Sequence, residues 1–350
     1  MAKLQPVPLT LTFELDNIAV APAGPGTTGT SETYYIDLSQ CKSLVARKFH
    51  RQGLLHAVAG MRLSSVNVAP GTTAQVSTAP SGSIMITKLP STWPVSNGWH
   101  KAFSHWKRQQ DEAIDESGAQ SAVATYRDFK IFMDSEHVQQ FVDAAMPVGQ
   151  TQNLLPSSFG GVGVYSQANV GEWQPSLIVV PNSAADATGS DVDPTEYYLH
   201  MVGGNFGPGS VSRGIIDGYQ YSRAYPQSPD PVSPALDSGF NWMRDMFDVG
   251  NDNVEIIQNA TDRNDELPYP QVDYPGGDTQ LPSLECSSFD PISGSTVGGV
   301  TYIKGNTFPC GLIRIDITNF DQTYDMRNIL QVDLVPGHKD GYLTEPMQDM

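Results

Sequence analysis

Residues 9–15 read LTLTFEL and residues 311–318 read GLIRIDIT, and in both stretches apolar and polar side chains alternate. A period of two places every second side chain on the same face of a strand. Each stretch therefore predicts a β-strand with one buried face and one face in water, so strands are expected near both ends of the chain.

Further runs rich in β-branched and aromatic residues predict additional short strands, separated by turn signals such as Pro70-Gly71. They are residues 33–38, 61–68, 73–78, 83–87, 128–133, 177–180, 197–202, 214–216, 300–304 and 328–335. Strands at this spacing favour a sandwich or barrel. We expect an all-β fold: a single jelly-roll β-sandwich domain over residues 1–350, with long loop insertions and two or three short helices. A long acidic, proline-rich loop is expected at about 251–298 and a polar C-terminal tail from about 336.

Two segments depart from the strand pattern. Residues 97–117 place Trp99, Phe103 and Trp106 on one helical face, which predicts an amphipathic helix capped by Asn97 and ended by Ser117-Gly118. Residues 234–249 carry a second apolar stripe. Its candidate subunit-interface residues are Phe240, Trp242, Met243 and Phe247, with the core of the monomer as the alternative.

The composition favours strands, turns and loops, because only 17% of residues are charged while glycine (32) and proline (26) are frequent. The chain has no run of about 18 apolar residues, so no membrane helix is expected. The N-terminal residues lack the pattern of a secretory signal, which indicates a protein made in the cell interior and not secreted.

Motifs of catalysis are missing from the sequence. There is no G-x-S-x-G, no phosphate-binding G-x-x-x-x-G-K-[ST], no H-E-x-x-H and no C-x-x-C. We therefore expect no enzyme activity, no catalytic residues, no cofactor and no metal site. Two alternatives stay open: a triad of residues distant in sequence, and Ca²⁺ binding by the acidic residues 262–278 instead of a solvated loop.

The net charge of −18 is unevenly distributed along the chain. Residues 1–110 hold ten Lys or Arg against four acidic residues, a net of +6, so the remainder carries −24. The candidate nucleic-acid-binding residues are Lys42, Arg47, Lys48, Phe49, Arg51 and Arg62. Cations attract phosphates and an aromatic ring can stack on an unpaired base, although an ordinary solvated face is an equally simple interpretation.

Several longer stretches resemble a known family when taken in order. They are residues 89–113 (LPSTWPVSNGWHKAFSHWKRQQDEA), 126–134 (YRDFKIFMD), 171–180 (GEWQPSLIVV), 212–224 (SRGIIDGYQYSRA), 264–277 (NDELPYPQVDYPGG) and 310–317 (CGLIRIDI). Together they resemble capsid proteins of small circular Rep-encoding single-stranded DNA viruses. The Trp-rich helix and the loop of Asp265, Glu266 and residues 273–277 are the most specific parts.

This resemblance implies a self-assembling jelly-roll subunit located in the virion. It also implies an icosahedral (T=1) shell of sixty copies and a circular single-stranded DNA cargo. The family's Arg-rich N-terminal arm is missing, since Lys3 is the only Lys or Arg among the first 41 residues. A folded inner surface, with residues 42–62, is then expected to contact the genome. A carbohydrate-binding β-sandwich, lectin-like or phage receptor-binding with Trp93 and Trp173 in a sugar groove, is the alternative. A hydrolase on a β scaffold is the third reading.

Overall fold

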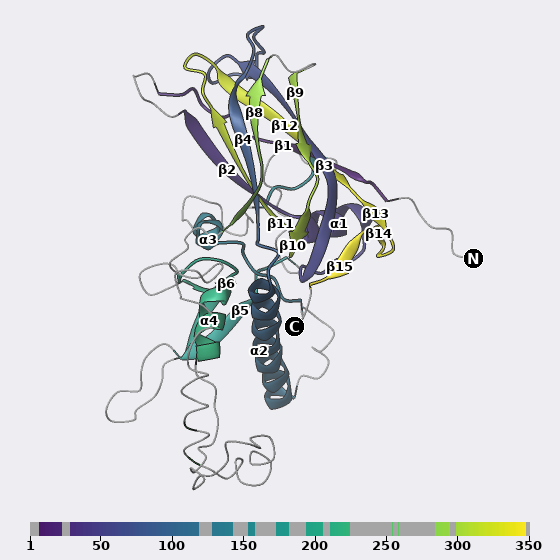
Figure 1. Cartoon of the computed structure of the whole chain (residues 1–350), viewed down its shortest axis with the longest axis vertical. Coiled ribbons are helices and arrows are strands. Elements are labelled where there is room, and N and C mark those ends of the chain that lie inside the picture. The colour runs from purple at the N-terminus through teal and green to yellow at the C-terminus, as the bar shows by residue number, and fades with distance from the viewer. Residues whose placement is uncertain are drawn as a thin grey trace, which may run out of the picture.

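The structure is a computed structural model that describes residues 7–22, 29–118, 128–142, 153–157, 173–181, 194–205, 211–224, 254, 258, 284–294 and 299–347. It is mostly β, as expected, and two antiparallel sheets form a sandwich (Figure 1). A smaller lobe with most of the helices lies at one end of the sandwich.

Sheet A is built around one long strand, β3 (Leu54–Val68). β12 (Asp325–Leu334) pairs with one edge of β3, and β1 (Thr10–Glu14) pairs with the far side of β12. β9 (Val300–Lys304) pairs with the other edge of β3. The short strands β10 (Thr307–Pro309) and β15 (Thr344–Pro346) pair with the first residues of β3.

Sheet B has the order β2-β11-β4-β8. Its strands are β2 (Thr30–Asp37), β11 (Leu312–Asn319), β4 (Ser81–Lys88) and β8 (Glu285–Ser293). Strands that are far apart in the sequence are therefore neighbours in this sheet: β2 pairs with β11, and β4 pairs with β8.

The core of the sandwich comes from the alternation seen in the sequence. Leu11 and Phe13 of β1 and Ile313, Ile315 and Ile317 of β11 are fully buried in one hydrophobic cluster. Their polar neighbours in the sequence lie on the outer faces of the sheets. Burial of such side chains contributes about 1.5–3 kcal/mol each, so this alternating pattern determines which face of each strand is inside.

α1 (Leu38–Ala46) follows β2 directly and packs at the base of the sandwich. Asp37 caps this helix, because its carboxylate accepts hydrogen bonds from the backbone N–H groups of Ser39 and Gln40. The chain ends beside it with β13 (Pro336–Gly337), β14 (Gly341–Tyr342) and β15. The prediction of a polar tail from 336 is wrong, since Tyr342 and Met347 are buried.

Everything between β4 and β8 belongs to an insertion, residues 89–284. Its described elements are α2 (Trp93–Ser117), α3 (Ser135–Val142), β5 (Leu177–Pro181), β6 (Pro194–His200), β7 (Ser212–Gly214) and α4 (Ile215–Ala224). β5, β6 and β7 form a separate small sheet. The insertion has its own hydrophobic cluster, anchored by Trp99 and Trp106 of α2 as predicted, and this cluster reaches Tyr35 and Leu312 of sheet B.

Other boundaries differ from the expectation. Residues 73–78 and 128–133 form only isolated bridges, at Gln75 and Phe132, so neither is a strand. α2 begins four residues before Asn97, with Thr92 as its N-cap, and ends at Gly118 as predicted. The loop expected at about 251–298 contains the strand β8, in which Pro291 is tolerated because β8 is an edge strand.

Candidate nucleic-acid interface

Four of the six predicted nucleic-acid-binding residues lie together in the loop between α1 and β3. Arg47 is the C-cap of α1 in a left-handed conformation (φ 53°), which turns the chain out to the surface. Lys48, Phe49 and Arg51 follow it and are all exposed. The Lys48 ammonium lies 3.1 Å from an Asp340 carboxylate oxygen, and this exposed pair leaves both groups accessible to water.

Phe49 belongs to an aromatic and cationic cluster that the sequence did not predict. Its ring stacks against that of Trp173 with a centroid distance of 5.9 Å, and the Lys130 ammonium lies 5.0 Å from the Trp173 centroid. Lys130 also lies 3.7 Å from a carboxylate oxygen of Asp128. Burial raises the pKa of Asp128 to about 6, while Lys130 and Arg51 lower it. Lys130 and Trp173 are 81 and 124 residues from Phe49 in the sequence, so no local pattern could have identified them.

Lys42 does not belong to this surface, and its assignment to a nucleic-acid contact is wrong. It lies on the inner face of α1 and is fully buried. Its ammonium lies 3.1 Å from His56 Nδ1 and 5.2 Å from the ring centroid of Tyr342. Burial lowers the pKa of Lys42 to about 8 and lowers that of His56 well below its ordinary value. Spacing alone could not separate Lys42 from its exposed neighbours, because nothing in sequence marks which face of α1 meets the sandwich.

Arg62 lies apart from the 47–51 loop, so the six residues do not form one patch. It is eight residues beyond Leu54 along β3, roughly 26 Å at the rise of an extended strand. Its side chain is on the outer face of sheet A, where its guanidinium lies 3.0 Å from Asp333 Oδ2. Tyr302 on β9 is directly opposite Arg62 and is 71% exposed.

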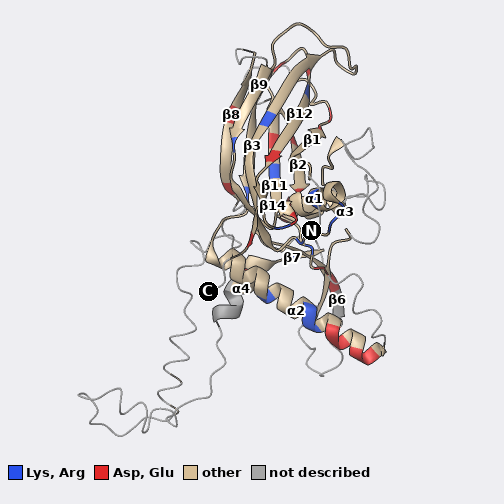
Figure 2. Ribbon diagram, turned by 90° about the vertical axis from the view of Figure 1, so that its right-hand side faces the viewer, with Lys and Arg blue, Asp and Glu red and all other residues tan. Residues whose placement is uncertain are grey.

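The outer face of sheet A therefore forms a second candidate surface. Its cationic residues are Arg62, Lys304 and Arg327, and its acidic residues are Glu14, Asp333 and Glu345. Basic and acidic residues are interspersed on the sandwich, whereas the acidic residues of α2 gather at the C-terminal end of that helix (Figure 2). On this face Arg62 pairs with Asp333 and Arg327 lies 3.8 Å from Glu14, and the aromatic ring of Tyr302 is exposed.

The outer face of sheet B has a different role, because Arg314 connects it to the insertion. Its guanidinium contacts Asp316 on the same strand at 3.1 Å, and Asp134 at 3.0 Å and Glu136 at 2.6 Å in the insertion. The Tyr35 hydroxyl donates to Asp134 at 2.9 Å. Burial, followed by the Asp134 charge, raises the pKa of Tyr35. This network fixes the start of α3 against the sandwich.

A serine and a histidine also pair in the insertion. Ser212 Oγ lies 2.9 Å from His200 Nδ1, and His200 Nε2 lies 2.9 Å from the carbonyl oxygen of Gly204. A carbonyl only accepts, so Nε2 carries the proton and Nδ1 accepts from the serine hydroxyl. Both side chains are fully buried, which makes the pair a link between β6 and β7 with no access for a substrate.

Within the described ranges, no three His, Cys, Asp or Glu residues gather in a way that could hold a metal ion. Among these same residues, no helix is both long and apolar enough to cross a membrane. Cys41 and Cys310 are buried, whereas Cys286 is exposed.

Three further predictions concern the candidate interface residues, the acidic cluster and the two tryptophans of a sugar groove. The candidate interface residues Phe240, Trp242, Met243 and Phe247 and the acidic cluster at 262–278 lie outside the described residues. The two tryptophans expected in a sugar groove pack against other side chains: Trp173 against Phe49 and Lys130, and Trp93 edge-on to Tyr219 at 6.3 Å.

Comparison of the chain with models of known protein families, with curated proteins and with solved structures found no match.

Proposed function

We propose that this chain is the subunit of a self-assembling viral capsid and that its sandwich is a jelly roll. The observation that carries the proposal is the pairing of the eight main strands. Counted along the chain, the first pairs with the eighth, the second with the seventh, the third with the sixth and the fourth with the fifth. Such nested pairing is what a long hairpin gives when it is wound into two four-stranded sheets.

Jelly rolls occur in capsid proteins, lectins and cupins, so the fold alone does not distinguish among these functions. The capsid is favoured by the sequence resemblance in the Trp-rich helix, residues 126–134 and residues 212–224, all in the insertion. The insertion projects beyond one end of the sandwich (Figure 1). In a closed shell, projections of this kind cover neighbouring subunits.

Assembly also needs surfaces that are exposed in the single subunit and can be buried between subunits. β8 is an edge strand of sheet B, and it carries a large exposed ring, Phe289, which is 64% exposed. Unpaired strand edges invite pairing with another chain. Phe240, Trp242, Met243 and Phe247 remain our candidates for the subunit interface. Sixty copies would form an icosahedral particle.

The cargo in this proposal is circular single-stranded DNA, and the virion is the location of the protein. Two surfaces are suited to the inside of the shell: the 47–51 loop, with Arg47, Lys48 and Arg51, and the outer face of sheet A around Arg62. Each carries a modest charge, but many copies around a common cavity would bind one strand with high avidity. The acidic end of α2 would repel DNA and is expected to face outward.

Electron microscopy of the purified full-length chain tests this function. We expect uniform closed particles, with DNA that resists nuclease when the particles come from infected or DNA-supplied cells. A monodisperse monomer at every salt concentration and pH would contradict the proposal. A glycan array is the complementary test, because saturable sugar binding by that monomer would favour the carbohydrate-binding alternative.

A further inference from the structure

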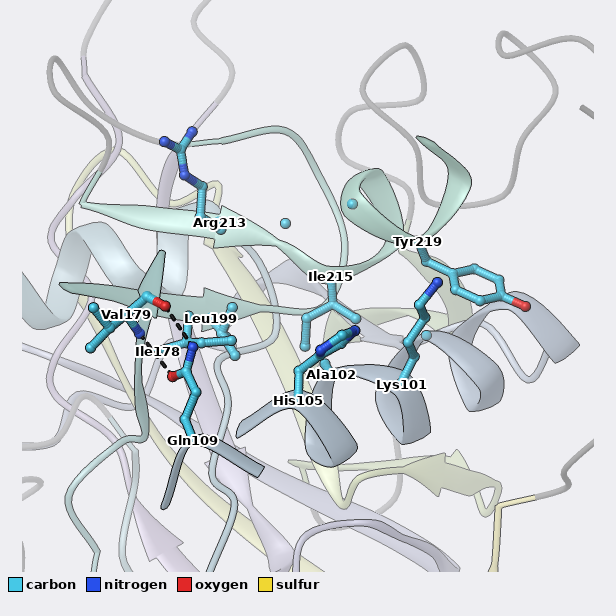
Figure 3. A pocket seen from close by; sticks show the side chains of 13 residues that line it. Lys101, Ala102, His105, Gln109, Ile178, Val179, Leu199, Arg213, Ile215 and Tyr219 are labelled. Atoms are coloured by element: carbon cyan, nitrogen blue, oxygen red, sulfur yellow. Dashed lines mark hydrogen bonds between the residues drawn. The ribbon is translucent and has the colours of Figure 1, made fainter. Parts of the chain in front are cut away.

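A pocket of about 390 Å³ lies in the insertion between α2, α4 and the small sheet β5-β6-β7 (Figure 3). Small-molecule sites commonly have roughly 300–1,000 Å³, so this volume suits a ligand of modest size. The apolar part of the lining includes Ile178, Leu199 and Ile215, and the described lining contains no Asp or Glu.

The pocket is held open by a direct link between α2 and the edge of the small sheet. The Gln109 side-chain amide donates to the Val179 carbonyl oxygen at 2.6 Å and accepts from the Val179 N–H at 3.2 Å. Within the described part of the chain, this double hydrogen bond takes the place of strand pairing on the edge of β5 away from β6. One end of the pocket is thereby fixed (Figure 3).

Three glycines line the pocket, and only two of them are explained by packing. A Cβ atom on Gly214 would lie 2.2 Å from the Gly203 carbonyl oxygen, and one on Gly98 would lie 3.3 Å from Ile216. Gly218 is different, because a Cβ there would meet nothing within 4 Å. Glycine inside a helix costs about 1 kcal/mol relative to alanine, and Gly218, which is exposed and lines the pocket, has open space where a side chain would stand.

The charges at the rim are positive. Lys101 projects from α2 at the end of the pocket opposite Gln109, beside Tyr219 (Figure 3). Arg213 lies on the strand side, but its guanidinium is 4.4 Å from the Tyr197 ring centroid and points away from the other labelled lining side chains (Figure 3). An apolar floor with the Lys101 cation at its border is complementary to a molecule that has a hydrocarbon body and one negative group.

We propose that this pocket binds a small amphipathic anion of the acyl carboxylate class. The hydrocarbon chain lies over Ile178, Leu199 and Ile215, and the carboxylate lies toward Lys101. The described lining comes from one chain, so the pocket does not need a neighbouring subunit to form.

The probe is decanoate, titrated into the full-length protein by calorimetry below its micellar concentration. We expect saturable binding with one site per chain. Decanol should bind about fivefold more weakly and decyltrimethylammonium more weakly still, because the rim is cationic. Equal binding of all three probes, or no saturation, would overturn the proposal.

Gly218→Leu tests the location of the site. The new side chain enters open space on a helix, so the protein should melt at the same or a higher temperature while decanoate binding falls at least tenfold. Decanoate affinity unchanged in Gly218→Leu would place the ligand elsewhere and overturn the assignment.

Lys101→Ala tests the charge, with Lys107→Ala as the matched control, because Lys107 is an exposed lysine on the opposite face of the same helix. Lys101→Ala should weaken decanoate about fivefold and leave decanol unchanged, and Lys107→Ala should change neither. Equal effects of the two variants would contradict a role for Lys101. These variants also keep the proposal testable if Gly218→Leu does not fold.

Discussion

Arg314 shows how a single side chain attaches the insertion to the sandwich. It reaches three carboxylates, two of them from the insertion, and its own side chain is mostly buried. The sequence marks Arg314 only as a polar position in an alternating strand. Its two partners in the insertion lie about 180 residues earlier, so the network could not be predicted.

Replacing Arg314 with methionine should lower the free energy of unfolding by about 3–5 kcal/mol, because buried Asp134 would lose its cationic partner and retain only neutral donors such as the Tyr35 hydroxyl. Arg314→Lys should recover only part of the loss, since an ammonium cannot donate to three carboxylates in a planar fork. Urea denaturation measures both. A loss below about 1 kcal/mol for Arg314→Met would show that the network does not stabilise the fold.

His137 should make stability depend on pH. Its ring stacks on Tyr35 at 4.1 Å, its Nδ1 accepts from the Met133 N–H, and burial lowers its pKa to about 4. The unfolded chain takes up a proton near the ordinary value of 6.5, so the unfolded state binds more protons between pH 6.5 and 4. The contribution of His137 to the free energy of unfolding is therefore lost as the pH falls through that window, by about 2 kcal/mol from pH 7 to 5.

The comparison with His137→Gln isolates this effect, because glutamine can still accept from Met133 but does not titrate. The control is necessary since Asp128, with its pKa raised to about 6, acts in the opposite direction below pH 6. Urea denaturation at pH 7 and pH 5 should show a steeper loss for the wild type than for the variant. Parallel losses would contradict a buried neutral His137.

Among the elements, the edge strands β8 and β9 allow a matched test of where DNA binds. Tyr302→Ala on β9 should weaken binding of single-stranded oligonucleotides several-fold, because base stacking on a ring contributes about 1–3 kcal/mol. Phe289→Ala removes an equally exposed ring from the other sheet and should leave the affinity unchanged. Fluorescence anisotropy at fixed salt measures both, and equal losses would contradict a DNA-facing sheet A.

The C-terminal segment is the element that sequence composition misjudged. β15 pairs with residues 54–56 of β3, Tyr342 donates from its hydroxyl to the Pro8 carbonyl at 2.9 Å, and Met347 enters the core of the insertion. Truncation after Val335 should therefore lower the melting temperature by well over 10 °C, as the loss of two buried side chains and a strand implies. An unchanged melting temperature in calorimetry would show that the segment is only a surface tail.

The other elements differ in how far local pattern could predict them. β1 and β11 alternate strictly, and the structure buries the predicted faces. Residues 128–133 show a similar pattern, yet their backbone groups bond to Leu199, Met201 and Ser176 individually and form no ladder. Lys42 and Arg51 look alike in sequence and differ completely in burial. Pairing partners and the orientation of α1 are tertiary properties, so they lie beyond a local pattern.

At the scale of the whole molecule, nested strand pairing and the large insertion agree with a subunit whose exposed surfaces are buried against identical neighbours. The edge strand β8 carries the exposed ring of Phe289, and the insertion projects beyond the sandwich. Closed symmetry would cover such surfaces in every copy at once.

Sedimentation velocity of the purified chain tests most directly whether the subunits assemble into a closed particle. Sixty subunits of 37.9 kDa would sediment as one sharp boundary of about 2.3 MDa. Assembly should be cooperative, with few intermediate species between subunit and particle. A single boundary at the mass of one chain, unchanged as protein and salt concentrations rise, would contradict the account.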